Sequence, residues 1–179
     1  AYGVFANDGV KQEPVSILKV VDASGKTLEE YKPGSGKRIF KPEITYLISH
    51  ILSDDSARFL AFGPRSLLYI AGKSVAVKTG TTDEKKDNWA FGYTPSYVVG
   101  TWVGNNDNTA MDKSIASGVT GATPIWNKIM HLLVDNKPDE PFKRPDNIVS
   151  VNVDSKTGYL ANSASTSTKN EIFIKGTEP

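Results

Sequence analysis

The chain has 179 residues, of which 39% are hydrophobic and 23% are charged, and its formal net charge at pH 7 is +1. This composition is typical of a folded globular protein, and the length is sufficient for one hydrophobic core with a small addition. A net charge so close to zero gives no chain-wide attraction to polyanions, so we expect no nucleic-acid partner.

The residues suited to binding metals are few. Cysteine is absent, which excludes disulfides, thiolate metal sites and a cysteine nucleophile. The 2 histidines, His50 and His131, point away from the apolar arcs of their helix-like segments. Surface positions are the simpler interpretation, and a general base or metal ligand is the alternative. We therefore expect neither a metal nor an organic cofactor.

The sequence shows neither a membrane span nor an N-terminal signal peptide. No apolar run is long enough to span a bilayer, and the N-terminus lacks the basic, apolar and small-residue sections of a signal peptide. The first residues, AYGVFANDG, are typical of the end of a helix. We therefore expect the sequence to be part of a longer protein.

The N-terminal part of the chain predicts a β-hairpin followed by a helix. Residues 16–32 alternate around a glycine-containing turn at 22–26, which is the pattern of a hairpin. Residues 41–57 carry apolar side chains at helical spacing, and Pro42 is suited to the first turn. We expect this apolar stripe to face a sheet; it consists of Ile44, Leu47, Ile48, Ile51 and Leu52.

Three segments rich in β-branched and aromatic residues predict an antiparallel meander. They span residues 69–82, 88–95 and 96–107. A polar loop at 83–87 joins the first two, and a tight turn around 94–96 joins the last two. Connections this short favour antiparallel neighbours.

A second amphipathic helix is predicted in the segment 123–138, with Thr123 as its N-cap, Pro124 at its first position and Pro138 beyond its end. Its apolar positions are expected to lie in the core. They are Ile125, Trp126, Ile129, Met130 and Leu133.

The remaining sequence divides at a proline-rich linker, 138–147. We expect residues 1–137 to form the main domain and residues 148–179 a small β-rich extension, with one hairpin at 151–160 and one more short strand. The predicted fold class is therefore α+β: an antiparallel meander covered by helices, with a small β appendage.

Lys78-Thr79-Gly80 stands at the end of the first predicted strand of the meander. On a strand, Thr79 and Thr81 point to one face and Lys78 and Gly80 to the other, so two hydroxyls line up as a small anion clamp. Gly80 leaves room for a substrate backbone, and the unpaired N–H groups of an edge strand can donate to it. A carboxylate anchor, a backbone donor for an oxyanion and a positive charge are what an acyl-transfer site requires.

A second copy of the triplet, Lys156-Thr157-Gly158, shows how little information three residues carry. It follows Asp154-Ser155 and precedes YLAN, which fits a turn in which the glycine supplies a positive φ. We interpret this copy as structural.

The setting of the first copy is more specific. VAVKTGTT, a polar loop, NWAFGYTPSYVVGTWVGNND and GVTGATPIWNKIM follow one another without interruption. In this order they resemble the C-terminal part of the transpeptidase domain of bifunctional, class A penicillin-binding proteins. The resemblance extends from AYGVFANDG to FIKGTEP, and it implies an incomplete penicillin-binding protein or serine β-lactamase-like fold, with residues 1–137 belonging to the transpeptidase domain.

The resemblance also implies a function. Class A penicillin-binding proteins are membrane-anchored enzymes on the extracytoplasmic face of the bacterial cell membrane. They polymerise peptidoglycan and cross-link its stem peptides through an acyl-enzyme, and penicillin acylates them. Lys78 would be the electropositive catalytic residue, and the backbone N–H of Thr81 would be one oxyanion donor. Thr79 and Thr81 would bind the terminal carboxylate of a D-Ala-D-Ala stem peptide or of a β-lactam, and Gly80 and Thr82 would complete the substrate-binding strand.

The S-x-x-K and S-x-N motifs that supply this family's nucleophile and base have no suitable counterpart. Ser16 and Lys19 match the first pattern, but they lie in an alternating strand segment, where residues three apart point to opposite faces. The family's motif opens a helix, where the two side chains share a face. SVN at 150–152 follows K-T-G, contrary to the family's order. We therefore expect both motifs, a glycosyltransferase domain and the membrane anchor in an upstream part of the same protein, and this chain alone to be inactive.

Two alternatives stay open. A serine β-lactamase shares the K-T-G strand and the acyl-enzyme chemistry, and efficient penicillin turnover by the longer protein would favour it. A non-catalytic module that binds cell-wall glycan or protein would use Trp89, Trp102 and Trp126 as contacts. All three tryptophans lie in strand or helix patterns that are more typical of the core.

Overall fold

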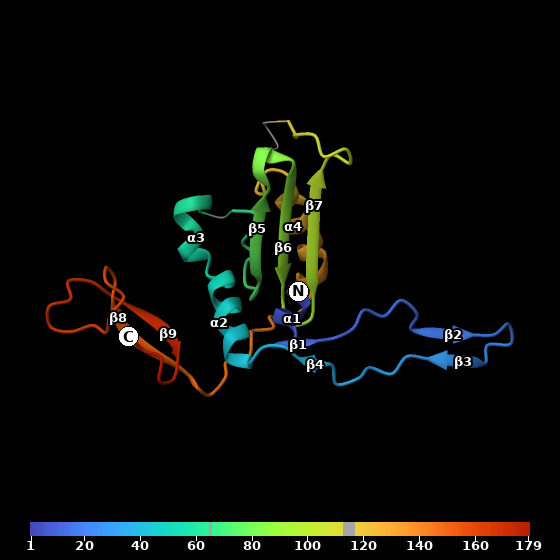
Figure 1. Cartoon of the computed structure of the whole chain (residues 1–179), viewed down its shortest axis with the longest axis horizontal. Coiled ribbons are helices and arrows are strands. Elements are labelled where there is room, and N and C mark those ends of the chain that lie inside the picture. The colour runs from blue at the N-terminus through green and yellow to red at the C-terminus, as the bar shows by residue number, and fades with distance from the viewer. Residues whose placement is uncertain (65, 113–116) are drawn as a thin grey trace.

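The structure is a computed structural model that describes residues 1–64, 66–112 and 117–179 (Figure 1). Its helices are α1 (Tyr2–Ala6), α2 (Pro42–Ser53), α3 (Asp55–Phe62) and α4 (Ala122–Val134), with a short 3₁₀ helix at Asp83–Lys85. Its strands are β1 (Val10–Lys11), β2 (Lys19–Val21), β3 (Thr27–Glu30), β4 (Lys37–Arg38), β5 (Ala76–Thr81), β6 (Asp87–Tyr93), β7 (Val98–Gly104), β8 (Ile148–Asp154) and β9 (Thr168–Ile174). Within the described residues they form one three-stranded sheet and three two-stranded sheets.

The three-stranded sheet is the predicted antiparallel meander, in the order β5-β6-β7. Every residue of β5 pairs with β6, so the Lys-Thr-Gly strand forms one edge of the sheet. The β6–β7 turn is closed by Thr94, whose hydroxyl accepts the backbone N–H groups of Ser96 and Tyr97 at 3.2 and 3.1 Å. The first strand is shorter than predicted, because the chain turns at residues 71–72 and becomes extended only from Ala76.

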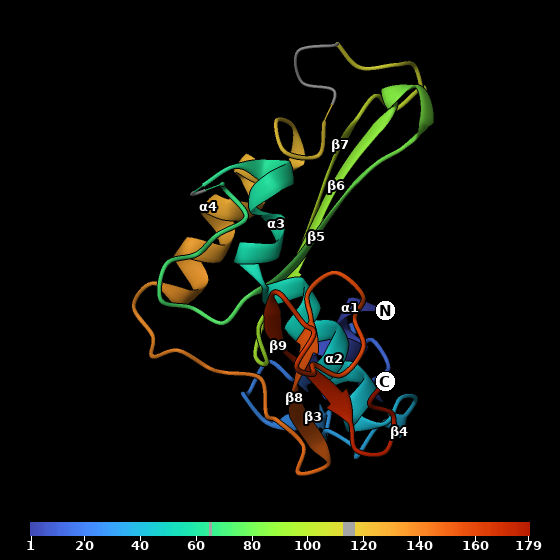
Figure 2. The same ribbon diagram turned by 90° about the vertical axis from the view of Figure 1, so that its left-hand side faces the viewer.

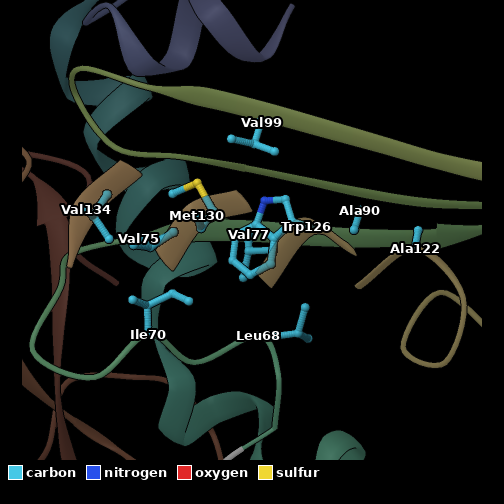
Figure 3. Close-up of a cluster of buried hydrophobic side chains, with 10 residues drawn as sticks. All are labelled: Leu68, Ile70, Val75, Val77, Ala90, Val99, Ala122, Trp126, Met130 and Val134. Carbon is cyan, nitrogen blue, oxygen red and sulfur yellow. The ribbon is translucent and has the colours of Figure 1, made fainter. Parts of the chain in front are cut away.

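Helix α4 covers one face of the sheet and carries the centre of the core (Figures 2 and 3). Trp126 and Met130 are both fully buried against the strands. Ile125 and Ile129, which we expected in the core, are instead 47% and 37% exposed. Each lies one position before a buried residue, and a rotation of 100° per residue moves it to the flank of the helix. The core cluster comprises Leu68, Ile70, Val75, Val77, Ala90, Val99, Ala122, Trp126, Met130 and Val134.

The start of α4 also differs from the prediction. Gly121, not Thr123, is the N-cap, and Thr123 lies inside the first turn. Its hydroxyl and its backbone N–H both donate to the carbonyl of Gly118, at 2.6 and 3.0 Å. Thr123 therefore fastens α4 to the loop before it.

The opposite face of the sheet contacts α1 and α2. Tyr2 of α1 stacks on Phe91 with 4.7 Å between the ring centroids. From α2, the hydroxyl of Ser49 lies 3.0 Å from that of Tyr93, which is fully buried. Burial raises the pKa of Tyr93, and the hydrogen bond to Ser49 opposes that rise. Helix α1 thus meets the sheet mainly at β6, whereas α2 packs mainly along β5 and reaches β6 through the bond between Ser49 and Tyr93.

The orientation predicted for α2 was wrong in part. Its buried residues are Thr45 and Ser49, each 1% exposed, whereas Ile44 and Ile51 of the expected stripe are 42% and 64% exposed. Ser49 faces the sheet, where it contacts Tyr93, whereas Thr45 lies close to Gly9, just beyond the end of α1.

The predicted helix at 41–57 is divided in two. Asp54 separates α2 from α3 and caps α3, since its carboxylate accepts the N–H of Ala57 at 3.1 Å and the hydroxyl of Ser56 at 2.5 Å. These bonds, led by the one from Ser56, hold the pKa of Asp54 below its ordinary value.

The predicted N-terminal hairpin is confirmed as β2–β3. One carboxylate oxygen of Asp22 accepts the backbone N–H groups of Ser24 and Lys26 at 2.9 and 3.0 Å, which closes the turn. Figure 1 shows this hairpin extending away from the central sheet, on a stem where β1 pairs with β4.

The C-terminal segment forms a hairpin of different register from the one predicted. β8 pairs along its whole length with β9, and only an isolated bridge, Val153↔Leu160, remains of the hairpin expected at 151–160. Residues 138–147 contain no helix or strand. They are fastened at both ends: the N–H and hydroxyl of Ser74 donate to Asp139 at 2.6 and 2.8 Å, and Asn147 donates to Glu43 of α2 at 2.6 Å.

Candidate active site on the Lys-Thr-Gly strand

Strand β5 presents its polar side chains on two faces. Lys78 and Gly80 pair with Phe91 and Trp89 of β6, on the face that contacts α1. Thr79 and Thr81 lie on the face that α4 covers, two positions apart along the strand. The ammonium and the two hydroxyls therefore approach the end of β5 from opposite sides, as strand alternation requires.

The backbone of β5 alternates between β6 and the open edge. The carbonyl of Val77 lies 3.5 Å from the guanidinium of Arg58 in α3, and the carbonyl of Thr79 accepts the ammonium of Lys78. In an antiparallel pair the N–H and C=O of one residue point to the same side, and successive residues alternate. Val77, Thr79 and Thr81 thus direct their backbone groups away from β6, which leaves the N–H of Thr81 at the edge of the sheet.

The hydroxyl of Thr81 is oriented by the loop before α4. Its oxygen accepts the backbone N–H of Gly118 at 3.0 Å. A threonine hydroxyl has one proton to donate, and accepting a bond leaves that proton available. Exposed Thr81 can therefore donate both a hydroxyl and a backbone N–H to one anion, beside the exposed ammonium of Lys78. Half-buried Thr79 adds a second hydroxyl on the same face.

Gly80 and Thr82 differ in their surroundings. A Cβ on Gly80 would contact only the Cβ of Trp89, at 3.7 Å, so the face above it is open among the described residues. Thr82 lies in the β5–β6 turn, where its hydroxyl donates to the carboxylate of Asp87 at 3.0 Å and accepts the N–H of Asp87 at 2.8 Å. The other carboxylate oxygen accepts the indole N–H of Trp102 at 2.7 Å. This turn fixes the end of the strand.

Sequence reasoning did not single out Gly118. It lies 37 residues beyond Thr81, and no local pattern links a glycine in a loop to a hydroxyl that far away. Within residues 1–64, 66–112 and 117–179, no group of three or more histidine, aspartate or glutamate side chains is arranged to hold a metal ion. Nor does any helix in these ranges have the length and apolarity needed to cross a membrane.

Two family models match the chain. One, described as the penicillin binding protein transpeptidase domain, matches residues 1–131. The chain belongs to the penicillin-binding protein transpeptidase family. The second model, described as the C-terminal domain of penicillin-binding protein 1A, matches residues 144–179.

Penicillin-binding proteins of other bacteria are similar to this chain over its whole length. Penicillin-binding protein 1A of Aquifex aeolicus is 35% identical over 179 residues, which are 100% of this chain and 24% of the relative. Penicillin-binding protein 2D of Bacillus subtilis is 28% identical over 183 residues, covering 100% of this chain and 26% of that protein. The chain thus spans about a quarter of the length of the curated relatives it matches.

Solved structures of this family share the fold. The crystal structure of penicillin-binding protein 1A from Haemophilus influenzae superposes with a TM-score of 0.85 and 26% identity, over 99% of this chain and 31% of that one. PonA1 of Mycobacterium tuberculosis gives a TM-score of 0.68 and 25% identity, over 80% of this chain and 39% of that one. The α+β penicillin-binding protein fold inferred from sequence is confirmed.

The second Lys-Thr-Gly lies in a turn. The carboxylate of Asp154 accepts the N–H groups of Lys156 and Thr157, each at 3.0 Å, and these bonds lower the pKa of Asp154. Gly158 has a φ of +77°, as a turn glycine would. The turn predicted for this copy, with a glycine of positive φ, is therefore confirmed.

The matches to S-x-x-K at 16–19 and to S-x-N at 150–152 do not lie on helices. Lys19 is on β2, where its ammonium pairs with Glu30 at 3.4 Å. The strand predicted over both residues begins only at Lys19, because the chain bends at Ser16. Ser150 and Asn152 are both on β8; the hydroxyl of Ser150 accepts the guanidinium of Arg144 at 2.8 Å.

The expectation that all three tryptophans lie in the core was wrong for two of them. Trp126 is fully buried, but Trp89 and Trp102 are 38% and 40% exposed. They lie with Phe91 and Tyr2 on the sheet face opposite α4, with centroid distances of 6.3 Å between the indoles and 5.6 Å from Trp89 to Phe91. Alternation on β6 and β7 sends these rings to the less covered face of the sheet.

Proposed function

We propose that this chain supplies the Lys-Thr-Gly part of the active site of a serine-type peptidoglycan D,D-transpeptidase, which cross-links stem peptides through an acyl-enzyme and is acylated by penicillin. The family membership supports the reaction class. The observation that carries the proposal is the open edge of β5, where Thr81 is exposed and the ammonium of Lys78 reaches the carbonyl of Thr79.

Each group has a role in this proposal. The hydroxyls of Thr79 and Thr81 bind the terminal carboxylate of a D-Ala-D-Ala peptide or a β-lactam, and Gly80 admits the peptide backbone. The N–H of Thr81 donates to the oxyanion that forms when the serine attacks. The positive charge of Lys78 stabilises the ligand carboxylate and acts on the surroundings of the serine. Thr82 completes the strand by holding the β5–β6 turn.

The nucleophile and its base are proposed to come from an upstream part of the same protein. A serine and a lysine that exchange a proton must share a face and lie within hydrogen-bond reach. Lys19 instead pairs with Glu30 on an exposed strand, which supports the view that Ser16 and Lys19 are not this pair. The upstream part would also hold the S-x-N motif, a glycosyltransferase domain and the membrane anchor, with the active site on the extracytoplasmic face.

We also propose a domain division: 1–137 as the C-terminal portion of the transpeptidase domain, 138–147 as a linker and 148–179 as a β-rich extension. The extents of the two family matches and the irregular backbone of 138–147 support it.

The proposal is tested by the rate of penicillin acylation of the full-length protein. Replacing Lys78 with alanine removes one preorganised electrostatic group, so the second-order rate should fall about 10²- to 10³-fold. Lys156→Ala is the matched control, because it alters the same motif in a turn, and its rate should equal that of the wild type. Equal rates in the two variants would refute the proposed role of Lys78.

A further inference from the structure

Asn88 occupies an unusual position behind the proposed carboxylate site. On β6 it pairs with Thr81 of β5 and with Val103 of β7. Residues paired across antiparallel strands send their side chains to the same face, with Cβ atoms about 5 Å apart. Asn88 therefore lies beside the Thr81 side chain, on the face covered by α4 and the loop that contains Gly118.

The amide of Asn88 is fully buried, and it has no hydrogen-bond partner among the residues that the structure describes. Its exposure is 0%, and neither its oxygen nor its nitrogen is bonded to any group in the described parts of the chain. An unsatisfied buried polar group destabilises a folded protein, and native proteins contain few of them. Its neighbour on the same face of β6, Ala90, and its partner Val103 are apolar. An apolar side chain would suit this position better.

A buried polar side chain that forms no hydrogen bond brings no stability, and residues of this kind are expected at functional sites. The partner of Asn88 on β5 is Thr81, whose hydroxyl is held on this face of the sheet by the N–H of Gly118. An amide has two N–H donors, and unpaired donors in a buried, low-dielectric setting interact strongly with a nearby negative charge. A ligand carboxylate bound to the Thr81 hydroxyl would place a negative charge near the Asn88 amide, with the hydroxyl between them.

We propose that Asn88 is a positioning residue for Thr81. Its amide provides polar surroundings that keep the Thr81 hydroxyl turned towards Gly118, with the hydroxyl proton directed to the ligand carboxylate. Its donors also stabilise the bound negative charge through Thr81, without touching the ligand. This inference rests on the proposed function, and it adds a specificity determinant for ligands that carry a free carboxylate.

The test compares two ligands in the full-length protein: penicillin and its methyl ester. Asn88→Leu replaces the amide by an apolar group of similar size, and it should not lower the midpoint of thermal unfolding. Acylation by free penicillin should fall about tenfold, less than for loss of a direct donor. Acylation by the ester should change little, so the ratio of the two rates should fall about tenfold. Asn88→Ala, which adds no bulk, should lower the ratio in the same way even if the leucine variant folds poorly.

Thr101→Val is the matched control. Thr101 is a buried polar residue on the same face of β7, 7% exposed, and its hydroxyl donates to the carbonyl of Ala122 at 3.0 Å. It lies one strand further from β5. Its loss should lower the unfolding midpoint and leave the ratio of the two acylation rates unchanged.

The outcomes separate the two proposals. The positioning role is wrong if both Asn88 variants slow acylation by the two ligands in equal proportion, or if they leave both rates unchanged. The proposed function would still hold in that case, provided that Lys78→Ala slows acylation. If penicillin does not acylate the wild type, or if Lys78→Ala has no effect, the proposed function fails and the role of Asn88 fails with it.

Discussion

The indole of Trp126 lies directly over Gly92: a Cβ on Gly92 would be 2.3 Å from Cζ2 of the ring. This close approach seats α4 on the middle of β6. Gly92 also pairs with Val77, the residue before Lys78. The packing of α4 on Gly92 therefore supports the strand that carries the candidate site.

Gly92→Ala should destabilise the transpeptidase domain, because the added methyl group forces the buried indole or the strand to move. Overpacking of this kind costs about 1–3 kcal/mol. The unfolding midpoint of the full-length protein, measured by calorimetry, should fall. Gly34→Ala is the control, since a Cβ there has no neighbour within 4 Å among the described residues. Equal midpoints for the two variants would contradict the packing account.

Valine at Thr79 or Thr81 should weaken recognition of the ligand carboxylate, because valine keeps the branched shape and removes the hydroxyl. Each hydroxyl bond to a charged group contributes about 1.5–3 kcal/mol, so acylation by free penicillin should slow about 10- to 100-fold. Methyl-esterified penicillin should react at nearly the wild-type rate. The measurement is stopped-flow acylation of the full-length protein with both ligands.

Thr157→Val is the control for these substitutions, because it changes the same residue type in the second Lys-Thr-Gly, and neither ligand should be affected. If Thr79→Val and Thr81→Val slowed the free and esterified ligands in the same proportion, the hydroxyls would not be the carboxylate anchor.

The stability contributed by Asp54 should depend on pH. Hydrogen bonds from Ser56 and Ala57 lower its pKa in the folded state. Stabilisation by a carboxylate with a lowered folded pKa is complete above its unfolded pKa, about 3.9, and is lost as the pH falls through the folded value.

Asp54→Ala should therefore destabilise the protein by about 1 kcal/mol at pH 7, the usual loss for an N-cap. The difference from the wild type should shrink below about pH 4. Thermal unfolding at pH 7 and pH 3 measures it, with Asp146→Ala as an exposed control outside any helix or strand. A difference that stayed constant over this range would rule out the carboxylate cap as its source.

The meander could be predicted from sequence because each of its strands is bounded by turn residues and joined by a short connection. The orientation of α2 could not. Ile44 and Ile51 have the correct spacing for a buried stripe, but the arc that faces the sheet is set by Ser49, which reaches the hydroxyl of Tyr93. Helical periodicity identifies an apolar arc, whereas the contact that selects the buried arc is 44 residues away in the chain.

The candidate site, too, could be predicted from the sequence only in part. Alternation along a strand is enough to predict that Thr79 and Thr81 share one face of β5. The bond from Gly118 that orients Thr81, and the buried amide of Asn88 beside it, depend on how the loop before α4 folds back onto the sheet. Contacts of that kind leave no periodic pattern in the sequence.

The central claim is that this chain holds the Lys-Thr-Gly part of a transpeptidase site whose nucleophile lies elsewhere in the protein. The most direct measurement incubates fluorescent penicillin with the full-length protein and, separately, with residues 1–179 alone, followed by denaturing electrophoresis and mass spectrometry. We expect a covalent band from the full-length protein, with the acylated serine outside this chain, and no band from the chain alone, because groups that act as a unit lose nearly all activity without the nucleophile. A stable adduct on the isolated chain, mapped to Ser16 or any other of its serines, would contradict the account.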